Sequence, residues 1–378
     1  MVKFTSLSRN VLTGILLTSS PLFADGPKLR RPVAPQEIRL TAAKLETEDG
    51  SPVIVQGVPN FPAPQDQFLS LMPQNGLDGW TIQEGRTGTW VNEDGEIRCI
   101  ALGGGWLRTD KEYSDFVLRF EYQLQPGGNT GIGLRCPSVG NPTFTGIEIQ
   151  LLDDGASKYA QLREDQYTGS IYYQVAAQRR ATLRPPGDWN ACEIRCIGDQ
   201  LRVEINGEVV NEVNLATVSQ KEGEPQSESP LANRPPVGHI ALQSHSTQVR
   251  FRKVEVLDLA IETSSGLRYV DLASGQGEPV PGEVAGTVTV HYVGQLLDGK
   301  RFSDSRELGP PVTVGLKDAI LGWEEGLRGM RPGGRRRLIV PPSLAYGSEG
   351  YEKLIPPDAT LVFEVELVSF APASGVVD

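Results

Sequence analysis

Three segments decide the fold of the C-terminal third of the chain: VTVHYVGQLLDGKRF at residues 288–302, LGWEEGLRGMRPGGRRRLIVPPSLAYG at 321–347 and LIPPDATLVFEVELVSF at 354–370. Apolar and polar residues alternate in the first and last segments, as in strands that pack one face on a core. Residues 321–327 are typical of a short helix and carry one Trp. Five aromatic residues recur where a small half-barrel needs a lined pocket: Tyr292, Phe302, Trp323, Tyr346 and Phe363.

This order of residues over 265–370 closely resembles the FKBP-type peptidyl-prolyl cis-trans isomerases. The resemblance implies an α+β half-barrel of antiparallel strands wrapped on a short helix, with no cofactor. It implies that Trp323 is the floor under a prolyl ring, that the Tyr346 hydroxyl donates to a substrate carbonyl, and that the Ile355 backbone N–H binds another. The other catalytic residues it implies are Tyr292, Phe302, Asp304, Ile320 and Phe363.

Such a pocket needs neither a nucleophile nor a metal. Rotation about a peptide bond faces a barrier of ~18–20 kcal/mol, and X-Pro bonds exchange slowly enough to limit folding. A pocket accelerates the exchange by favouring the twisted amide over both planar forms. We therefore expect proline-containing exported polypeptides as substrates.

Two departures from the family pattern keep a second hypothesis open. The family usually has Asp directly after the Phe, whereas Ser303 follows Phe302 here and the acid is Asp304. One residue on a strand turns a side chain to the opposite face, so Asp304 reaches the pocket only through a bulge, and Ser303 takes its place otherwise. Residues 310–312 also lack an aromatic wall. The alternative is a non-catalytic peptide-binding or chaperone module.

The N-terminus predicts export. Residues 1–24 combine Lys3 and Arg9 with a short apolar core and a plausible cleavage point, the pattern of a secretory signal peptide. Residues 25–66 are rich in proline, which predicts a disordered leader. No later stretch is apolar for long enough to span a bilayer. We expect a periplasmic or extracellular protein.

The net charge and the cysteines narrow the possible partners and metal sites. The net charge of −11, from 36 basic and 47 acidic residues, argues against nucleic acid as a partner. The cysteines are Cys99, Cys136, Cys192 and Cys196, without the spacing of a metal site. We interpret them as small buried hydrophobes, and one disulfide among them stays open.

Residues 67–259 show short alternating strands separated by Gly, Asn and Asp turns, which predicts a β-sandwich. A linker at 260–264 leads to the isomerase-like domain at 265–371 and a tail at 372–378. Strand parity in three segments, 131–136, 146–152 and 238–245, predicts one open polar face. Its members are Arg135, Glu148, Gln150, Gln243 and His245, with Asp153 at the rim.

This region resembles the 3-keto-disaccharide hydrolase family. The matching segments are GLDGW (76–80), GGNTGIGLR (127–135), GIEIQLLDD (146–154), TGSIY (168–172), GDWNACEI (187–194) and GHIALQSH (238–245). The resemblance implies a concanavalin-like jelly roll that acts on oxidised glycosides, in which a ketone at carbon 3 acidifies the neighbouring C–H.

Elimination from such a substrate needs a general base and a group that polarises the ketone. His245 or Glu148 is the candidate base, and Arg135 or a bound divalent metal ion the polariser. Two other interpretations stay open for this face: a saccharide-binding or merely solvated surface, and an ordinary glycosidase with Glu148 and Asp153 as its two carboxylates.

Overall fold

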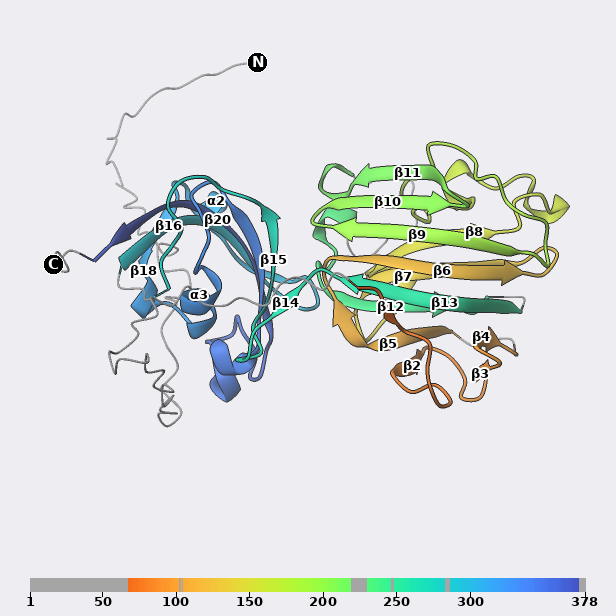
Figure 1. Ribbon diagram of the computed structural model, residues 1–378, viewed down its shortest axis with the longest axis horizontal. Helices are drawn as coiled ribbons and strands as arrows, with labels where there is room; N and C mark the ends of the chain where they lie inside the picture. The colour runs from red at the N-terminus through yellow and green to blue at the C-terminus, as the bar shows by residue number, and fades with distance from the viewer. Residues whose placement is uncertain are drawn as a thin grey trace, which may run out of the picture.

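The computed structural model describes residues 67–101, 103, 105–218, 230–245, 248–282 and 286–373. The predicted signal peptide (1–24) and leader (25–66) lie outside this part of the chain, as does most of the predicted tail (372–378). The described residues form two β-rich bodies side by side (Figure 1). The predicted fold class, mainly β with a jelly-roll sandwich before an α+β half-barrel, is confirmed.

The sandwich consists of two antiparallel sheets. The larger one has the order β11 (Glu208–Asn214), β10 (Gln200–Ile205), β9 (Trp189–Ile197), β6 (Phe116–Leu124), β13 (Val249–Asp258), β4 (Glu96–Cys99) and β3 (Trp90–Glu93), and β1 (Leu69–Ser70) pairs with β13. The smaller one has the order β2 (Trp80–Gln83), β5 (Trp106–Tyr113), β12 (Gly238–Gln243), β7 (Asn129–Cys136) and β8 (Ile147–Leu152).

Alternate residues of the two sheets meet in one core, as period-two strands require. Phe120 and Phe251 of the larger sheet pack with ring centroids 6.1 Å apart, and Ile132 and Ile149 face them from the smaller sheet. All four cysteines are buried and unpaired, which agrees with the interpretation of small hydrophobes. The short helices of this domain are α1 (Pro142–Thr145), η1 (Ser157–Tyr159), η2 (Glu164–Gln166), η3 (Leu215–Thr217) and η4 (Leu231–Asn233).

The second domain is one antiparallel sheet curled around a helix. Its order is β14 (Ile261–Glu262), β15 (Arg268–Ala273), β19 (Arg335–Val340), β20 (Leu361–Pro372), β16 (Gly286–Leu296) and β17 (Arg301–Asp304), with β18 (Val312–Gly315) paired to β16. Its helices are α2 (Ser305–Leu308), η5 (Leu316–Asp318), α3 (Leu321–Gly326), η6 (Pro342–Leu344) and η7 (Gly347–Glu349). Strand β14 lies within the predicted linker, so those residues belong to the sheet.

Helix α3 lies close against the sheet because two of its residues are glycines. A Cβ on Gly322 would come within 2.3 Å of a Val340 methyl carbon, and one on Gly326 within 2.7 Å of a Leu338 methyl carbon. The close approach buries Trp323 completely at the centre of the second core. Among the described residues, no helix has the length and apolarity that crossing a membrane requires.

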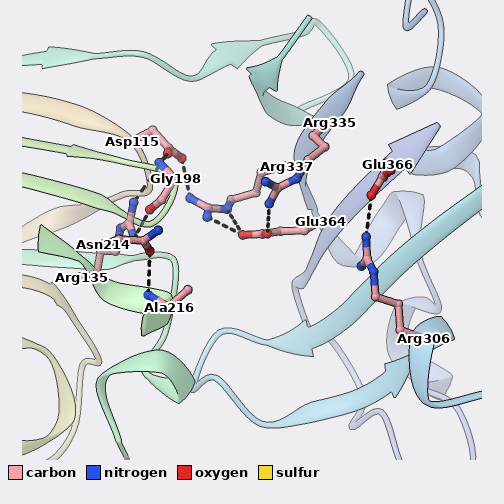
Figure 2. A network of polar contacts seen from close by, with 10 residues as sticks. All are labelled: Asp115, Arg135, Gly198, Asn214, Ala216, Arg306, Arg335, Arg337, Glu364 and Glu366. Atoms are coloured by element: carbon pink, nitrogen blue, oxygen red, sulfur yellow. Dashed lines mark hydrogen bonds and ion pairs between the residues drawn. The ribbon is translucent and has the colours of Figure 1, made fainter. Parts of the chain in front are cut away.

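A buried charge network joins the two domains (Figure 2). Arg337 of β19 pairs with Asp115 of the sandwich at 2.7 Å, with side chains only 1% and 0% exposed. Arg337 Nε also donates to Glu364 at 3.1 Å, and the Gly198 backbone N–H donates to Asp115 at 2.5 Å. Losing one partner of a buried pair costs about 3–5 kcal/mol, so this network fixes the contact.

Apolar residues surround the charges at the domain contact. Val237 of the sandwich packs with Ile339 and Val362 of the second domain, and Leu297 covers the cluster. The Arg268 side chain donates to the Glu112 backbone carbonyl at 3.0 Å. The outer face of β19 and β20 is thus covered by the sandwich, while their inner face forms the core around α3.

Candidate functional sites

The first candidate site is a cluster of aromatic rings around Trp323, at the position of the predicted pocket and referred to below as the aromatic pocket. The Trp323 ring meets those of Tyr292 and Phe363 edge to face, with centroids 5.0 and 5.5 Å apart. Phe302 of β17 meets Phe363 edge to face at 5.7 Å. Gly294 makes room for this pair, because a Cβ there would lie 2.7 Å from the Phe302 ring. The structure therefore brings four of the predicted aromatic residues together from three strands and one helix.

Two hydrogen-bond donors in this region have no partner within the described residues. They are the indole nitrogen of Trp323 and the hydroxyl of Tyr346, both buried. Burial, together with the neighbouring Tyr351 and Tyr292, raises the pKa of Tyr346, so its hydroxyl stays protonated. An unsatisfied buried donor costs about 1–3 kcal/mol. A carbonyl that accepts from either donor would recover that free energy.

Ile320 and Ile355 have different surroundings from each other. Ile320 is buried at the N-terminus of α3, and its carbonyl accepts from the backbone N–H of Trp323 at 3.0 Å. Ile355 is also buried, but its backbone N–H, predicted to bind a substrate, donates to the Tyr351 carbonyl at 3.1 Å. That donor is already used by a local turn, which the residue order alone does not reveal.

Asp304 does not reach the aromatic pocket. Its carboxylate accepts from the backbone N–H of Arg306 at 2.9 Å and so caps helix α2. Ser303 takes the position beside the pocket, where its hydroxyl lies 3.0 Å from that of Tyr292. The cause is a bulge at Phe302, the extra residue between the pairs Gly294–Ser303 and Gln295–Arg301. It puts Phe302 and Ser303 on the same side of the strand, so the next residue, Asp304, points to the opposite face.

The second candidate site lies on the outer face of the smaller sandwich sheet. Glu148 of β8 pairs across the sheet with Gly133 of β7, and Gln150 with Gly131. A Cβ on Gly131 would lie 2.4 Å from a Glu148 carboxylate oxygen, so the glycine leaves space for the acid. Gln243 of β12 donates to Glu148 Oε1 at 2.9 Å. The predicted grouping of Glu148, Gln150 and Gln243 on one face is present.

The electrostatics of Glu148 suit proton transfer. Its side chain is 2% exposed, and burial raises its pKa to about 7, against the opposite effects of Thr143, Gln243 and Arg234. The second carboxylate oxygen, Oε2, has no hydrogen-bond partner in the described part of the chain. A base whose pKa lies near neutrality combines a useful ionised fraction with a useful affinity for a proton.

This face is not the open surface that strand parity predicted. Glu148 and Gln150 are both buried because further segments close around them. Residues 168–172 pair along the free edge of β8, α1 contributes Thr143, and the segment after η4 contributes Arg234. Strand parity could not show these loops, so Thr143, Arg234 and the paired Tyr172 were missed, although Tyr172 ends the TGSIY segment.

Arg135 lies outside this site, which corrects the prediction. Its side chain donates to the carbonyls of Ser114 at 2.6 Å and Gly198 at 3.0 Å, and it lies 3.5 Å from Asp115 (Figure 2). The backbone of Arg135 has a φ of 50°, which breaks the alternation of β7 and redirects the side chain. It belongs to the charge network between the domains.

The two remaining predicted residues lie at the margins. His245 follows β12 and is exposed, and partial burial together with Lys158 lowers its pKa. Asp153 follows β8 and accepts from the Gly127 backbone N–H at 2.7 Å, which gives it a structural role in a turn. No group of three or more His, Cys, Asp or Glu side chains in the described ranges is arranged to hold a metal ion.

Comparison with known proteins identifies both domains. Residues 67–257 match the model of the 3-keto-alpha-glucoside-1,2-lyase-like domain, and residues 278–368 match that of the FKBP-type peptidyl-prolyl cis-trans isomerase. An FK506-binding protein of Neisseria meningitidis is 44% identical over 106 residues, which are 27% of this chain and 94% of that protein. The chain belongs to both families.

Other relatives match the isomerase-like domain alone. FkpA of Buchnera aphidicola is 46% identical over 107 residues, which are 28% of this chain and 43% of that protein. The crystal structure of FkpA from Escherichia coli is 42% identical over 30% of this chain and 52% of that chain, with a TM-score of 0.29. This chain thus spans less than half the length of the Buchnera protein.

Proposed function

We propose that the C-terminal domain catalyses cis–trans isomerisation of X-Pro peptide bonds. The observation that carries this proposal is the aromatic cluster: a fully buried Trp323 in edge-to-face contact with Tyr292 and Phe363, and a Tyr346 hydroxyl that has no partner among the described residues. The family membership supports it. No acid or nucleophile is required, which agrees with the position of Asp304 outside the pocket.

The proposed mechanism is preferential binding of the twisted amide. The prolyl ring packs on the indole of Trp323, and the aromatic walls exclude water, which stabilises the polar planar amide more than the twisted one. The Tyr346 hydroxyl donates to the carbonyl of the residue before proline. This hydrogen bond holds that residue in place while the X-Pro peptide bond rotates. Since the barrier is ~18–20 kcal/mol, each 1.36 kcal/mol of preference for the twisted form gives about tenfold in rate.

A proline-isomerisation assay on a short X-Pro peptide tests this proposal with the full chain. Acceleration should fall at least about tenfold in Phe363→Ala, because the wall shared with Trp323 and Phe302 is removed. Val368→Ala is the matched control, since Val368 is exposed on the same strand. A folded protein that gives no acceleration would favour the alternative, a non-catalytic peptide-binding or chaperone module.

For the sandwich we propose cleavage of a 3-keto-glycoside, with Glu148 as general base. The buried carboxyl with a pKa of about 7 favours this activity over a solvated surface. Glu148 takes the proton from carbon 2, beside the ketone, and the electron pair forms an enolate. The enolate expels the glycosidic oxygen from carbon 1, a double bond forms between carbons 1 and 2, and the leaving alcohol takes a proton.

Methyl α-D-3-ketoglucoside is a suitable probe, with the released methanol and the enone as products. Glu148→Gln should reduce the release about 10²–10⁴-fold, because the amide cannot accept the proton. Asp188→Asn removes an exposed carboxylate of the same domain and should leave turnover unchanged. Equal turnover by Glu148→Gln and the unaltered chain would assign the base to another residue.

We further propose that the protein is exported and acts on exported proline-containing polypeptides. The support is the signal-like pattern of residues 1–24. Expression of the chain with and without these residues, followed by fractionation and N-terminal sequencing, tests it. Retention of an intact N-terminus in the cytoplasm would contradict export.

A further inference from the structure

A tight turn lies directly beside Glu148. The backbone N–H of Tyr172 donates to the Glu148 carbonyl at 2.9 Å, and Ile171 pairs with Ile149. Ile149 and Ile171 both point into the sandwich core. Tyr172 and Glu148 are therefore cross-strand partners whose side chains share the opposite, outer face.

The turn brings two tyrosine rings together. Successive side chains of a strand point to opposite faces, but Tyr173 has a φ of 60°, and the Gln174 N–H closes the turn on the Ile171 carbonyl at 2.9 Å. As a result the rings of Tyr172 and Tyr173 lie with centroids 4.3 Å apart at 54°. Both residues are half-buried, so part of each side chain faces outward.

Turn geometry alone does not favour tyrosine at this position. The left-handed region is ordinary for Gly and costs other residues roughly 1–2 kcal/mol. Residues held there beside a reactive group are often part of the site. Burial and the groups around it raise the pKa of Tyr172 to about 12, so its hydroxyl remains a neutral donor and acceptor. Its oxygen accepts from the Gln166 side-chain amide at 3.4 Å.

We propose that the Tyr172–Tyr173 pair is the subsite that holds a pyranose ring against Glu148. This inference rests on the proposed saccharide chemistry of the sandwich. A pyranose has an apolar C–H face and a polar edge, which match the aromatic faces and hydroxyls of the two tyrosines. The cross-strand pairing with Glu148 places the bound ring next to the base.

Three variants of the full chain test the subsite, with methyl α-D-glucopyranoside as the binding probe and methyl α-D-3-ketoglucoside as the substrate. Tyr173→Gly removes one ring and relieves the backbone, so the protein should fold at least as stably. We expect its Kd and KM to rise about three- to tenfold with kcat nearly unchanged. Tyr172→Ala should weaken binding similarly, and Tyr172→Phe, which keeps the ring, should retain most of it.

The outcomes separate this inference from the proposed reaction. Turnover that is unaffected in Tyr173→Gly and Tyr172→Ala would overturn the subsite and leave the role of Glu148 intact. Binding that depends on the tyrosines, in a chain that turns over no ketoglucoside, would support the subsite and overturn the reaction. If the unaltered chain binds neither saccharide, the subsite is wrong.

Discussion

The two candidate sites differ in the kind of group that they bury: aromatic rings and neutral donors in one, a titratable carboxyl in the other. The isomerase pocket is built from aromatic rings around Trp323, and two of its neutral donors, Trp323 Nε1 and the Tyr346 hydroxyl, have no partner among the described residues. The sandwich site is built around one buried carboxyl, Glu148, whose pKa is raised to about 7. Rotation about a peptide bond needs no proton transfer, whereas elimination beside a ketone needs a base. In each domain, burial therefore favours the state of the group that the proposed reaction requires.

The largest expected effect separates the two reactions by their pH dependence. Turnover of the ketoglucoside should rise as the pH passes through about 7, because only ionised Glu148 accepts a proton. Glu148→Gln should reduce it about 10²–10⁴-fold. Isomerase activity should change little with pH in this range and little in Glu148→Gln. The measurement is both rates on one preparation from about pH 5 to about pH 9. Parallel pH profiles for the two rates would contradict the assignment of the two reactions to separate sites.

Breaking the contact between the domains should cost the most stability. Asp115→Ala leaves Arg337 and Arg135 in the buried network without their shared carboxylate partner. We expect a loss of about 3–5 kcal/mol in the free energy of unfolding. Urea unfolding, followed separately by Trp fluorescence and isomerase activity, measures it. Asp188→Ala, an exposed control, should change the free energy by less than about 0.5 kcal/mol.

The outcome for the domain contact also tests how independent the two domains are. If they unfold as one unit, Asp115→Ala shifts a single transition. If the contact only orients them, the variant splits the curve into two transitions. A variant as stable as the unaltered chain, with one unchanged transition, would show that the network carries no stability.

The buried carboxyl of Glu148 should make the sandwich less stable at high pH. Its pKa in the folded protein is raised to about 7 from 4.5. The unfolded chain therefore releases this proton at lower pH than the folded one. The resulting penalty is absent below about pH 4.5, grows up to about pH 7 and is then constant, on the order of 3 kcal/mol at most.

Glu148→Gln removes that penalty and gives a signed prediction. The variant should unfold at a higher temperature than the unaltered chain at pH 8 and at nearly the same temperature at pH 4. Thermal unfolding across that range measures the difference. A variant that is less stable at pH 8 would mean that the ionised carboxylate is well paired in the folded protein.

Strand periodicity predicted much of this architecture and failed at definable points. It placed Glu148, Gln150 and Gln243 on one face, because outward positions of paired strands follow from parity. It failed at Arg135, where a positive φ interrupts the alternation, and at the loops that bury Glu148. Such contacts depend on segments far apart in the sequence. No local pattern encodes them.

The isomerase pocket was predicted by resemblance rather than by parity. The order of aromatic residues predicted a cluster around Trp323, and the rings of Tyr292, Phe302 and Phe363 meet there. It did not show that the Ile355 N–H is used by a turn or that Asp304 caps α2. The spacing around Phe302 did allow Ser303 as the residue beside the pocket, and its hydroxyl lies 3.0 Å from that of Tyr292.

The smallest effect concerns one hydroxyl in the isomerase pocket. Tyr346→Phe removes a buried O–H that has no partner in the described residues, so the free energy of unfolding should stay equal or rise by about 1 kcal/mol. The kcat/KM for an X-Pro peptide should fall about two- to tenfold, the value of one hydrogen bond to the substrate.

Tyr351→Phe is the matched control, because its ring lies 5.1 Å from that of Tyr346 and its loss of a hydroxyl should leave kcat/KM unchanged. Chemical denaturation and the peptide assay on the same samples decide between two roles. Lower stability with unchanged kcat/KM would show that the Tyr346 hydroxyl supports the fold. Unchanged or higher stability with lower kcat/KM would show that it acts on the substrate. The second result would also explain why a neutral donor has no partner among the described residues, since the proposed reaction requires no proton transfer.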